Sequence, residues 1–252
     1  YDAVVIAIGS PEDNKLGIPG EDKDGVIGSA AFVGWYNGHP DFVDLDPNLD
    51  TANVCVIGNG NVAIDIARLL VKTRGELSPS DITNDALDAI QASSITDVYM
   101  LGRRGPVEAK FTNVELREMG KLEICVPQID GGIIPDAVPE DMEMSDRDRR
   151  LRDKNLDTLR EFAPRAADEL PKRVHFQFFA APREILGGDK VEGIRMERTK
   201  VEEGRCIPTG ETFDVDCGMV VTCIGSRAEP IEGLPFDDKK GIVEHEDGRV
   251  RG

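Results

Sequence analysis

The sequence predicts a mixed α/β fold, in which helices flank a parallel sheet and an antiparallel β excursion follows late in the chain. Apolar runs of strand type alternate with amphipathic helical patterns, and this alternation is typical of a parallel sheet. A glycine-rich turn joins one predicted strand directly to a helix. Two segments, 190–201 and 211–216, read as a hairpin, which adds the antiparallel part.

The composition limits the classes of function. The chain has 252 residues, of which 40% are hydrophobic, and this is typical of a globular protein with one large or two modest domains. The net charge of −18 argues against a general affinity for nucleic acid, which needs a basic surface. No apolar run approaches the roughly 20 residues that span a bilayer, so we expect no membrane span.

The cysteines indicate a reducing environment. The five cysteines include no C-x-x-C pair, and the three histidines are scattered along the chain. We therefore expect neither a disulfide framework nor a metal site. Buried, reduced thiols suit an intracellular compartment, so the sequence favours a cytoplasmic location.

The two ends of the chain indicate a fragment of a longer protein. An apolar run at 3–8 predicts a strand buried on both faces, and a natural protein rarely begins inside such a strand. A similar run at 220–224 also ends in Gly-Ser, although chance could produce this similarity. We therefore predict that residues 1–11 and 225–252 are crossings towards a second domain, and that residues 12–224 form the domain between them.

Hydrophobic periodicity predicts the elements between these ends. Residues 10–50 are rich in Pro, Gly and Asp and read as a connecting segment, apart from an apolar stretch at 30–36. A strand at 53–57 precedes a helix at 61–72, whose apolar residues follow an i, i+4, i+7, i+8 pattern. The further predicted elements are helices at 80–92, 112–119 and 140–162 and strands at 97–101, 122–126, 174–178 and 219–224.

A phosphate-binding turn is predicted between the strand at 53–57 and the helix that follows it. Residues 58–63 read G-N-G-N-V-A, which is the pattern G-x-G-x-x-A. Gly58 allows the tight turn, Gly60 lets a pyrophosphate approach the backbone, and Ala63 keeps the helix close to the strand. The free N–H groups and the positive dipole of the first helical turn would hold the anion. The pattern predicts a Rossmann-like dinucleotide-binding domain, and a plain tight turn is the alternative.

The end of the next strand indicates which dinucleotide binds. An NAD enzyme carries Asp or Glu there, to hold the ribose 2′-hydroxyl. Here the strand at 97–101 is followed by Gly102, Arg103 and Arg104. Because a guanidinium offers paired donors to phosphate oxygens, the two arginines favour the 2′-phosphate of NADP. A solvated basic loop is the alternative.

One acidic residue is a candidate for two roles. Thr112 and Glu115 have the spacing of a capping box at the start of a short helix, which would explain Glu115 by local structure alone. Glu115 also follows the arginine pair closely enough to reach the nicotinamide end of a bound dinucleotide. The residues themselves favour both roles equally.

Four motifs occur in order within residues 1–125. They are F-V-G-W-Y-N-G-H-P at 32–40, G-N-G-N-V-A-I-D-I-A-R at 58–68, G-R-R-G-P at 102–106, and the residues of 111–118 that include Phe111, Thr112 and Glu115. Together they resemble the adrenodoxin-reductase-type ferredoxin–NADP reductases, and most of all the bacterial branch of that family. The resemblance is looser after about residue 130.

The resemblance implies a flavoprotein that binds two dinucleotides. In this family FAD lies in a domain made from both ends of the full chain, and NADPH binds to a domain inserted between them. NADPH passes hydride to FAD, and single electrons then go to a ferredoxin-type iron–sulfur protein. The residues that the resemblance assigns are Asn59, Gly60, Asn61 and Val62 at the NADP pyrophosphate, Arg103 and Arg104 at the 2′-phosphate, and Glu115 near the nicotinamide.

The sequence departs from the whole-family pattern at both ends. It lacks the FAD-binding glycine-rich turn, so we expect this fragment to bind NADP without FAD and to lack turnover alone. An acidic ferredoxin would need a local basic patch on this acidic chain or on the other domain. Two alternatives are a regulatory dinucleotide-binding module and a glutamate-synthase-like electron-transfer subunit, which would lack the match at 35–40.

Overall fold

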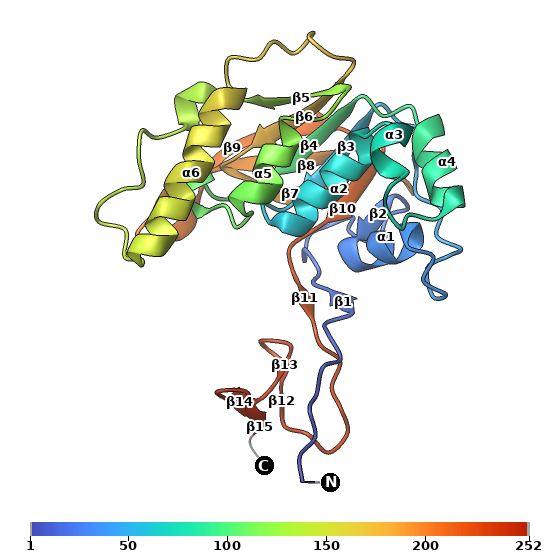
Figure 1. Cartoon of the computed structure of the whole chain (residues 1–252), viewed down its shortest axis with the longest axis vertical. Helices are drawn as coiled ribbons and strands as arrows, with labels where there is room; N and C mark the ends of the chain where they lie inside the picture. The colour runs from blue at the N-terminus through green and yellow to red at the C-terminus, as the bar shows by residue number, and fades with distance from the viewer. Residues whose placement is uncertain (1, 251–252) are drawn as a thin grey trace.

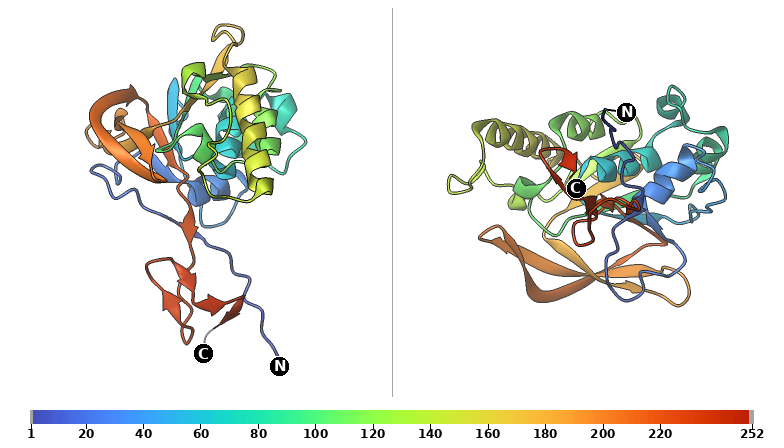
Figure 2. Two further views of the ribbon diagram at one scale, coloured as in Figure 1. Left: turned by 90° about the vertical axis from the view of Figure 1, so that its left-hand side faces the viewer. Right: turned by 90° about the horizontal axis from the view of Figure 1, so that it is seen from below.

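The predicted α/β architecture is confirmed by a computed structural model, which describes residues 2–250. The body of the molecule has three layers, namely a layer of helices, a central parallel sheet and a smaller antiparallel sheet (Figures 1 and 2). Below the body, the two ends of the chain extend away together. No helix within residues 2–250 is long and apolar enough to cross a membrane.

The central sheet has six strands, and all of its neighbouring pairs are parallel. Its order is β2 (Val26–Gly28), β10 (Met219–Thr222), β3 (Asn53–Ile57), β4 (Asp97–Leu101), β6 (Lys172–Gln177) and β5 (Cys125–Ile129). In β3, Val54 and Val56 face one core cluster while Cys55 and Ile57 face another, and all four are buried. Both faces of the sheet are therefore covered, which explains the continuous apolar run of this strand.

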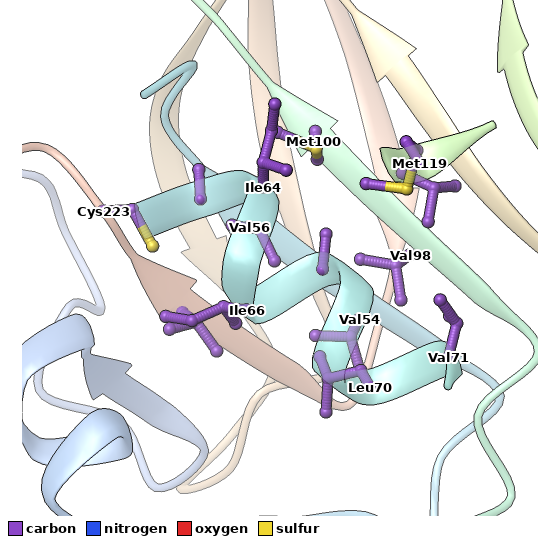
Figure 3. Close-up of a cluster of buried hydrophobic side chains, with 14 of the residues drawn as sticks. Val54, Val56, Ile64, Ile66, Leu70, Val71, Val98, Met100, Met119 and Cys223 are labelled. Atoms are coloured by element: carbon purple, nitrogen blue, oxygen red, sulfur yellow. The ribbon is translucent and has the colours of Figure 1, made fainter. Parts of the chain in front are cut away.

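Helix α2 (Asn61–Val71) lies at the centre of the helical layer. Ile64, Ile66 and Leu70 are fully buried, and the helix covers β3 and β4 (Figure 3). Side chains of five more helices join the same core cluster. The other helices are α1 (Ser29–Tyr36), α3 (Arg74–Leu77), α4 (Asn84–Ala92), α5 (Asn113–Met119) and α6 (Asp146–Phe162), with short 3₁₀ turns at Pro106–Glu108 and Gly131–Ile133.

The antiparallel excursion covers the opposite face of the central sheet. It consists of β7 (Ala180–Leu186), β8 (Gly193–Glu202) and β9 (Arg205–Asp216). The predicted hairpin corresponds to β8 and β9, and β7 is an additional strand. Ile185, Ile194 and Met196 are buried in one cluster with Cys55 and Leu101 of the central sheet. This packing fixes the excursion against the strands that carry the candidate site.

The predicted strand at 3–8 is wrong. These residues form no strand in the described chain, and Val4 and Val5 are 80% and 88% exposed. A strand buried on both faces needs pairing strands and covering layers, and no strand among residues 2–250 pairs with this segment. The prediction of a connecting segment at 10–50 also missed β2, a short edge strand that pairs with β10.

The two ends of the chain meet in a narrow neck. Here β1 (Glu12–Asp13) pairs antiparallel with β11 (Ser226–Arg227), and the Asn14 N–H donates to the Gly225 carbonyl at 3.0 Å. The segment below contains β12 (Phe236–Asp237), β13 (Ile242–Val243), β14 (His245–Glu246) and β15 (Arg249–Val250). The division at 1–11, 12–224 and 225–252 stays a prediction, and residues 1 and 251–252 lie outside the described chain.

Candidate functional site

Gly58 shapes the turn between β3 and α2. Its φ of 144° lies in a region that favours glycine, and a Cβ there would lie 2.3 Å from the carbonyl oxygen of Cys223. Its N–H donates to the Leu101 carbonyl at 2.9 Å. Any side chain at this position would therefore collide with the end of β10, so the fold itself requires this glycine.

Gly60 is different, because the fold does not require it. Its φ of −111° and ψ of 179° are open to any residue. A Cβ at Gly60 would meet no atom of residues 2–250 within 4 Å. A glycine with free space before it lets an external group approach the backbone closely, which is the property that a pyrophosphate site needs.

The start of helix α2 is open to an anion. No side chain of the described residues caps it, whereas the N-cap side chains of α3, α4, α5 and α6 each accept a hydrogen bond from their own helix. The first N–H groups of α2 are thus available, and the helix dipole adds positive potential there. Ala63 is fully buried against the core, as the motif predicts.

The side chains beside this turn hold it to its neighbours. The Asn61 Oδ1 accepts from the Thr112 N–H at 2.7 Å, and the Asn59 carbonyl accepts from the Lys110 N–H at 2.8 Å. The Asn59 amide lies so close to Gly102 that a Cβ there would overlap it, at 1.5 Å. Val62 is 47% exposed at the start of α2. The structure therefore brings the phosphate turn and the arginine loop, residues 102–105, into direct contact.

The arginine pair has free guanidinium groups. Arg103 is exposed and Arg104 is half-buried, and neither side chain forms an ion pair or hydrogen bond within the described chain. The Arg104 Nε is buried without an acceptor among residues 2–250. An unpaired guanidinium is unexpected in a chain with a net charge of −18. Both arginines can therefore donate to an anion next to the phosphate turn.

A cavity of about 550 Å³ lies beside the arginine loop. Its walls come from the carboxyl ends of β5 and β6, together with Phe179, Arg198 and Thr199. The Gln177 Oε1, which belongs to a lining residue, is buried and has no donor in the described part of the chain. Ligands of open α/β sheets bind at the carboxyl ends of the strands, so the cavity lies where the rest of a dinucleotide would extend.

Glu115 does not complete the predicted capping box. The Thr112 Oγ1 accepts from the Glu115 N–H at 3.4 Å, which is half of the motif. The other half is missing, because the Thr112 N–H donates to Asn61 instead. The Glu115 carboxylate lies 2.6 Å from the Arg68 guanidinium on α2. The prediction of a reciprocal box is therefore wrong, and the role near the nicotinamide stays a prediction.

Arg68 is shared between two carboxylates. The Asp65 carboxylate lies 3.4 Å from the same guanidinium nitrogen that contacts Glu115. Burial raises the pKa of Asp65, and the negative charge of Glu115 raises it further. Asp65 lies on α2 and Glu115 lies in the first turn of α5, the helix whose N-cap residue Thr112 donates its N–H to Asn61 of the phosphate turn. Residues 2–250 contain no group of three or more His, Cys, Asp and Glu that could hold a metal ion.

Sequence reasoning missed two residues that contact the arginine loop. The Thr199 hydroxyl and the Cys206 thiol both donate to the Arg103 carbonyl, at 2.7 and 3.0 Å. These residues lie 96 and 103 positions from Arg103. Because the contact depends on how the excursion packs on the sheet, no local pattern in the sequence could have shown it.

Comparison with known proteins agrees with this geometry. A family model described as pyridine nucleotide-disulphide oxidoreductase matches residues 1–251. The mitochondrial NADPH:adrenodoxin oxidoreductase of Arabidopsis thaliana is 42% identical over 267 residues, covering 99% of this chain and 54% of that protein. NADPH-ferredoxin reductase FprA of Mycobacterium tuberculosis is 39% identical over 257 residues, covering 100% of this chain and 56% of that protein.

A solved structure, Mycobacterium tuberculosis FprA in complex with NADPH, superposes with a TM-score of 0.92 at 39% identity. It is matched over 100% of this chain and 56% of its own length. The chain thus spans about half the length of the curated relatives it matches.

Proposed function

The chain belongs to the pyridine nucleotide-disulphide oxidoreductase family, and from this premise we propose that it is the NADPH-binding domain of a flavin-dependent ferredoxin–NADP reductase. The observation that carries the proposal is a pair of unpartnered arginines in a loop that contacts an open phosphate turn. The names of the relatives, NADPH-ferredoxin reductase and NADPH:adrenodoxin oxidoreductase, support the same activity for the whole protein.

We assign the parts of NADPH to three regions of the described chain. The N–H groups of the first turn of α2 hold the pyrophosphate, where Gly60 leaves the backbone accessible and Asn59, Asn61 and Val62 border it. Arg103 and Arg104 hold the 2′-phosphate through charge-assisted hydrogen bonds. The adenine extends towards the cavity beside the arginine loop, and Glu115 lies on the side of the nicotinamide.

FAD does not fit the described residues alone. Residues 2–250 contain one strand that runs through a glycine-rich turn into a helix, and this turn is assigned to NADPH. The apolar segment at 3–8 ends in Gly9 and Ser10 without a following helix. When bound to the whole protein, FAD would take hydride and release single electrons. This chain contributes the orientation of NADPH, and it is expected to bind NADPH without flavin.

The proposal is tested by calorimetric titration of the chain with NADPH and NADH. The wild type should bind NADPH more tightly, and Arg103→Ala/Arg104→Ala should bind both cofactors alike. Each lost charge-assisted hydrogen bond should weaken NADPH binding by about 1.5–3 kcal/mol. The double variant Lys239→Ala/Arg249→Ala is a matched control, because it removes two exposed cations from the segment below the neck. If the wild type binds NADH as tightly as NADPH, the arginine assignment is wrong.

We also propose that the acidic iron–sulfur partner docks on one cationic face of α6. Arg147, Arg150 and Lys154 follow an i, i+3, i+7 spacing and are exposed, and their side chains have no partner within residues 2–250. Leu151, between them, is 44% exposed. Such a patch on an acidic chain would attract an acidic surface and orient it. It meets the need for local positive charge without a contribution from another domain.

The docking proposal is tested with the full-length protein and a ferredoxin of acidic surface. Arg147→Glu/Arg150→Glu should weaken the complex by about 1–2 kcal/mol and reduce its dependence on salt. The control Arg147→Lys/Arg150→Lys keeps the charge and should bind as the wild type does. Unchanged affinity after the charge reversal would place the partner elsewhere.

A further inference from the structure

We infer that Thr199 and Cys206 are positioning residues that favour NADP over NAD, because they hold the backbone from which Arg103 and Arg104 extend. This inference rests on the proposed function, since it takes the arginine pair as the site of the 2′-phosphate. Both residues belong to the antiparallel excursion and not to the dinucleotide-binding motif. The Thr199 Oγ1 and the Cys206 Sγ donate to one acceptor, the Arg103 carbonyl, at 2.7 and 3.0 Å.

Thr199 lies next to an irregular part of the antiparallel sheet. Glu197 pairs with Thr212 and Thr199 pairs with Pro208, so the register of β8 with β9 shifts here, and the additional residues lie on β9, opposite Arg198. Irregularities of this kind are frequent beside functional sites. Thr199 is only 7% exposed, so its hydroxyl is a buried group whose hydrogen bond is given to the arginine loop. This hydrogen bond connects β8 directly to the arginine loop.

A strained residue holds the next position of the loop. Phe179 has a φ of +55°, which side chains other than glycine rarely adopt. Its N–H donates to the Arg104 carbonyl at 3.0 Å, and its own carbonyl accepts from the Thr199 N–H at 2.9 Å. Its ring fills the space beside Gly105, where a Cβ would lie 2.5 Å from it. A strained backbone of this kind persists only where the surrounding contacts hold it, and it is frequent at binding sites.

These contacts act on the backbone and leave the guanidiniums free. The carbonyls of Gly102, Arg103 and Arg104 all accept hydrogen bonds from residues 179–206, while the two arginine side chains have no partner in the described residues. A loop fixed in this way loses little freedom when a ligand binds, and preorganisation of this kind increases affinity. The gain in affinity applies to the 2′-phosphate, which the arginines contact. It does not apply to the rest of the nucleotide.

Thr199→Val tests this inference, because valine has nearly the same shape but lacks the hydroxyl donor. The probes are 2′,5′-ADP and 5′-AMP, titrated by calorimetry into the 252-residue chain. We expect Thr199→Val to weaken 2′,5′-ADP binding about three- to tenfold, which corresponds to one lost hydrogen bond. Binding of 5′-AMP should stay within about twofold. Thr199→Ser keeps the donor and should restore the preference for the 2′-phosphate.

Thr209→Val is the matched control. The Thr209 hydroxyl also donates to a backbone carbonyl of β8, that of Arg198, at 2.8 Å, but it does not contact the arginine loop. This variant should bind both probes as the wild type does. Cys206→Ala provides a second, partly exposed position, where a smaller loss is expected because a thiol is a weak donor. Cys206→Ser should retain the wild-type preference.

Three results would overturn the inference, and the third is distinct from the first two. If Thr199→Val and Cys206→Ala fold and keep the full preference for 2′,5′-ADP, the contacts serve stability alone. Equal weakening of both probes leads to the same conclusion. If instead the wild type does not distinguish 2′,5′-ADP from 5′-AMP, the assignment of the arginines fails first, and this inference fails with it.

Discussion

Substitution of Gly60 by alanine should separate ligand binding from folding. A Cβ at Gly60 would meet no atom of the described chain within 4 Å, and the backbone angles suit alanine. Loss of glycine freedom in the unfolded chain stabilises a protein by about 0.4–1 kcal/mol. Alanine is a poorer N-cap than glycine, which costs about 0.5–1 kcal/mol. These effects offset each other, so the free energy of unfolding should change by less than about 0.5 kcal/mol.

The same methyl group should interfere strongly with NADPH. It would occupy the space through which a pyrophosphate oxygen reaches the first N–H groups of α2. Loss of one charge-assisted hydrogen bond costs about 1.5–3 kcal/mol, so NADPH binding should weaken about 10- to 100-fold. Isothermal titration calorimetry measures the affinity, and urea unfolding measures the stability of the same preparation.

Gly58→Ala is the control that should behave in the opposite way. Its Cβ would lie 2.3 Å from the Cys223 carbonyl, at a φ of 144°. Overpacking and backbone strain together should lower the free energy of unfolding by about 2–4 kcal/mol. If Gly60→Ala is folded and binds NADPH as tightly as the wild type, the pyrophosphate does not lie at this backbone, and the reasoning from the glycine pattern is refuted.

Three further predictions concern charged groups. Burial would raise the pKa of Asp97, but hydrogen bonds from Arg173 at 2.5 and 2.6 Å, His175 at 2.7 Å and Thr96 hold it well below its usual range. The ionised carboxylate therefore stabilises the fold above about pH 4, and this stabilisation is lost as the pH falls. Asp97→Asn should lower the free energy of unfolding by about 2–4 kcal/mol at pH 7. In urea unfolding measured at several pH values, the free energy of unfolding of this variant should decrease less towards acid pH than that of the wild type. Asp13 accepts from the Ser29 hydroxyl at 2.7 Å and the Ala30 N–H at 2.8 Å, so Asp13→Ala should cost about 0.5–2 kcal/mol in thermal unfolding. Glu115→Gln removes a negative charge beside Asp65, and NMR titration should show a lower pKa for Asp65, whereas an unchanged value would show that burial alone raises it.

Local patterns predicted the central elements well. The strand at 53–57 and the strand at 97–101 have the predicted bounds, and α2 ends one residue earlier than predicted. The helix predicted at 80–92 begins at Asn84, because Thr83 caps it. These elements follow from side-chain periodicity and capping, which depend on neighbouring residues. The strand predicted at 122–126 is displaced to Cys125–Ile129, since both segments carry similar apolar residues.

Two similar apolar runs differ in structure, so the local pattern alone does not predict whether such a run becomes a buried strand. Val220 and Val221 are fully buried, because β2 and β3 pair with β10 on either side. Val4 and Val5 belong to an almost identical run, yet both are largely exposed. The difference lies in the strands that pair with each run, and the residues of the run itself do not specify those strands. The strand β2 was missed for the related reason that three residues show no periodicity.

The same distinction applies to the candidate site, where local motifs predict some features and contacts between distant elements determine others. The phosphate turn and the arginine loop were predicted from short motifs, because their chemistry requires particular residues at fixed spacing. Glu115 was harder, since its local pattern fits a capping box that Asn61 replaces from another helix. Hydrogen bonds between distant elements decide which of two local possibilities occurs, and a sequence pattern leaves such a choice open.

The arginine loop indicates why a motif identifies a ligand better than it predicts affinity. Arg103 and Arg104 supply the donors for a phosphate, but a flexible loop would lose conformational freedom when the phosphate binds. Thr199 and Phe179 restrict the loop during folding, so this loss does not recur on binding. Transfer of the G-R-R-G sequence alone into an NAD-binding relative should therefore give the charge without the full affinity. The contacts from the antiparallel excursion would have to be transferred with it.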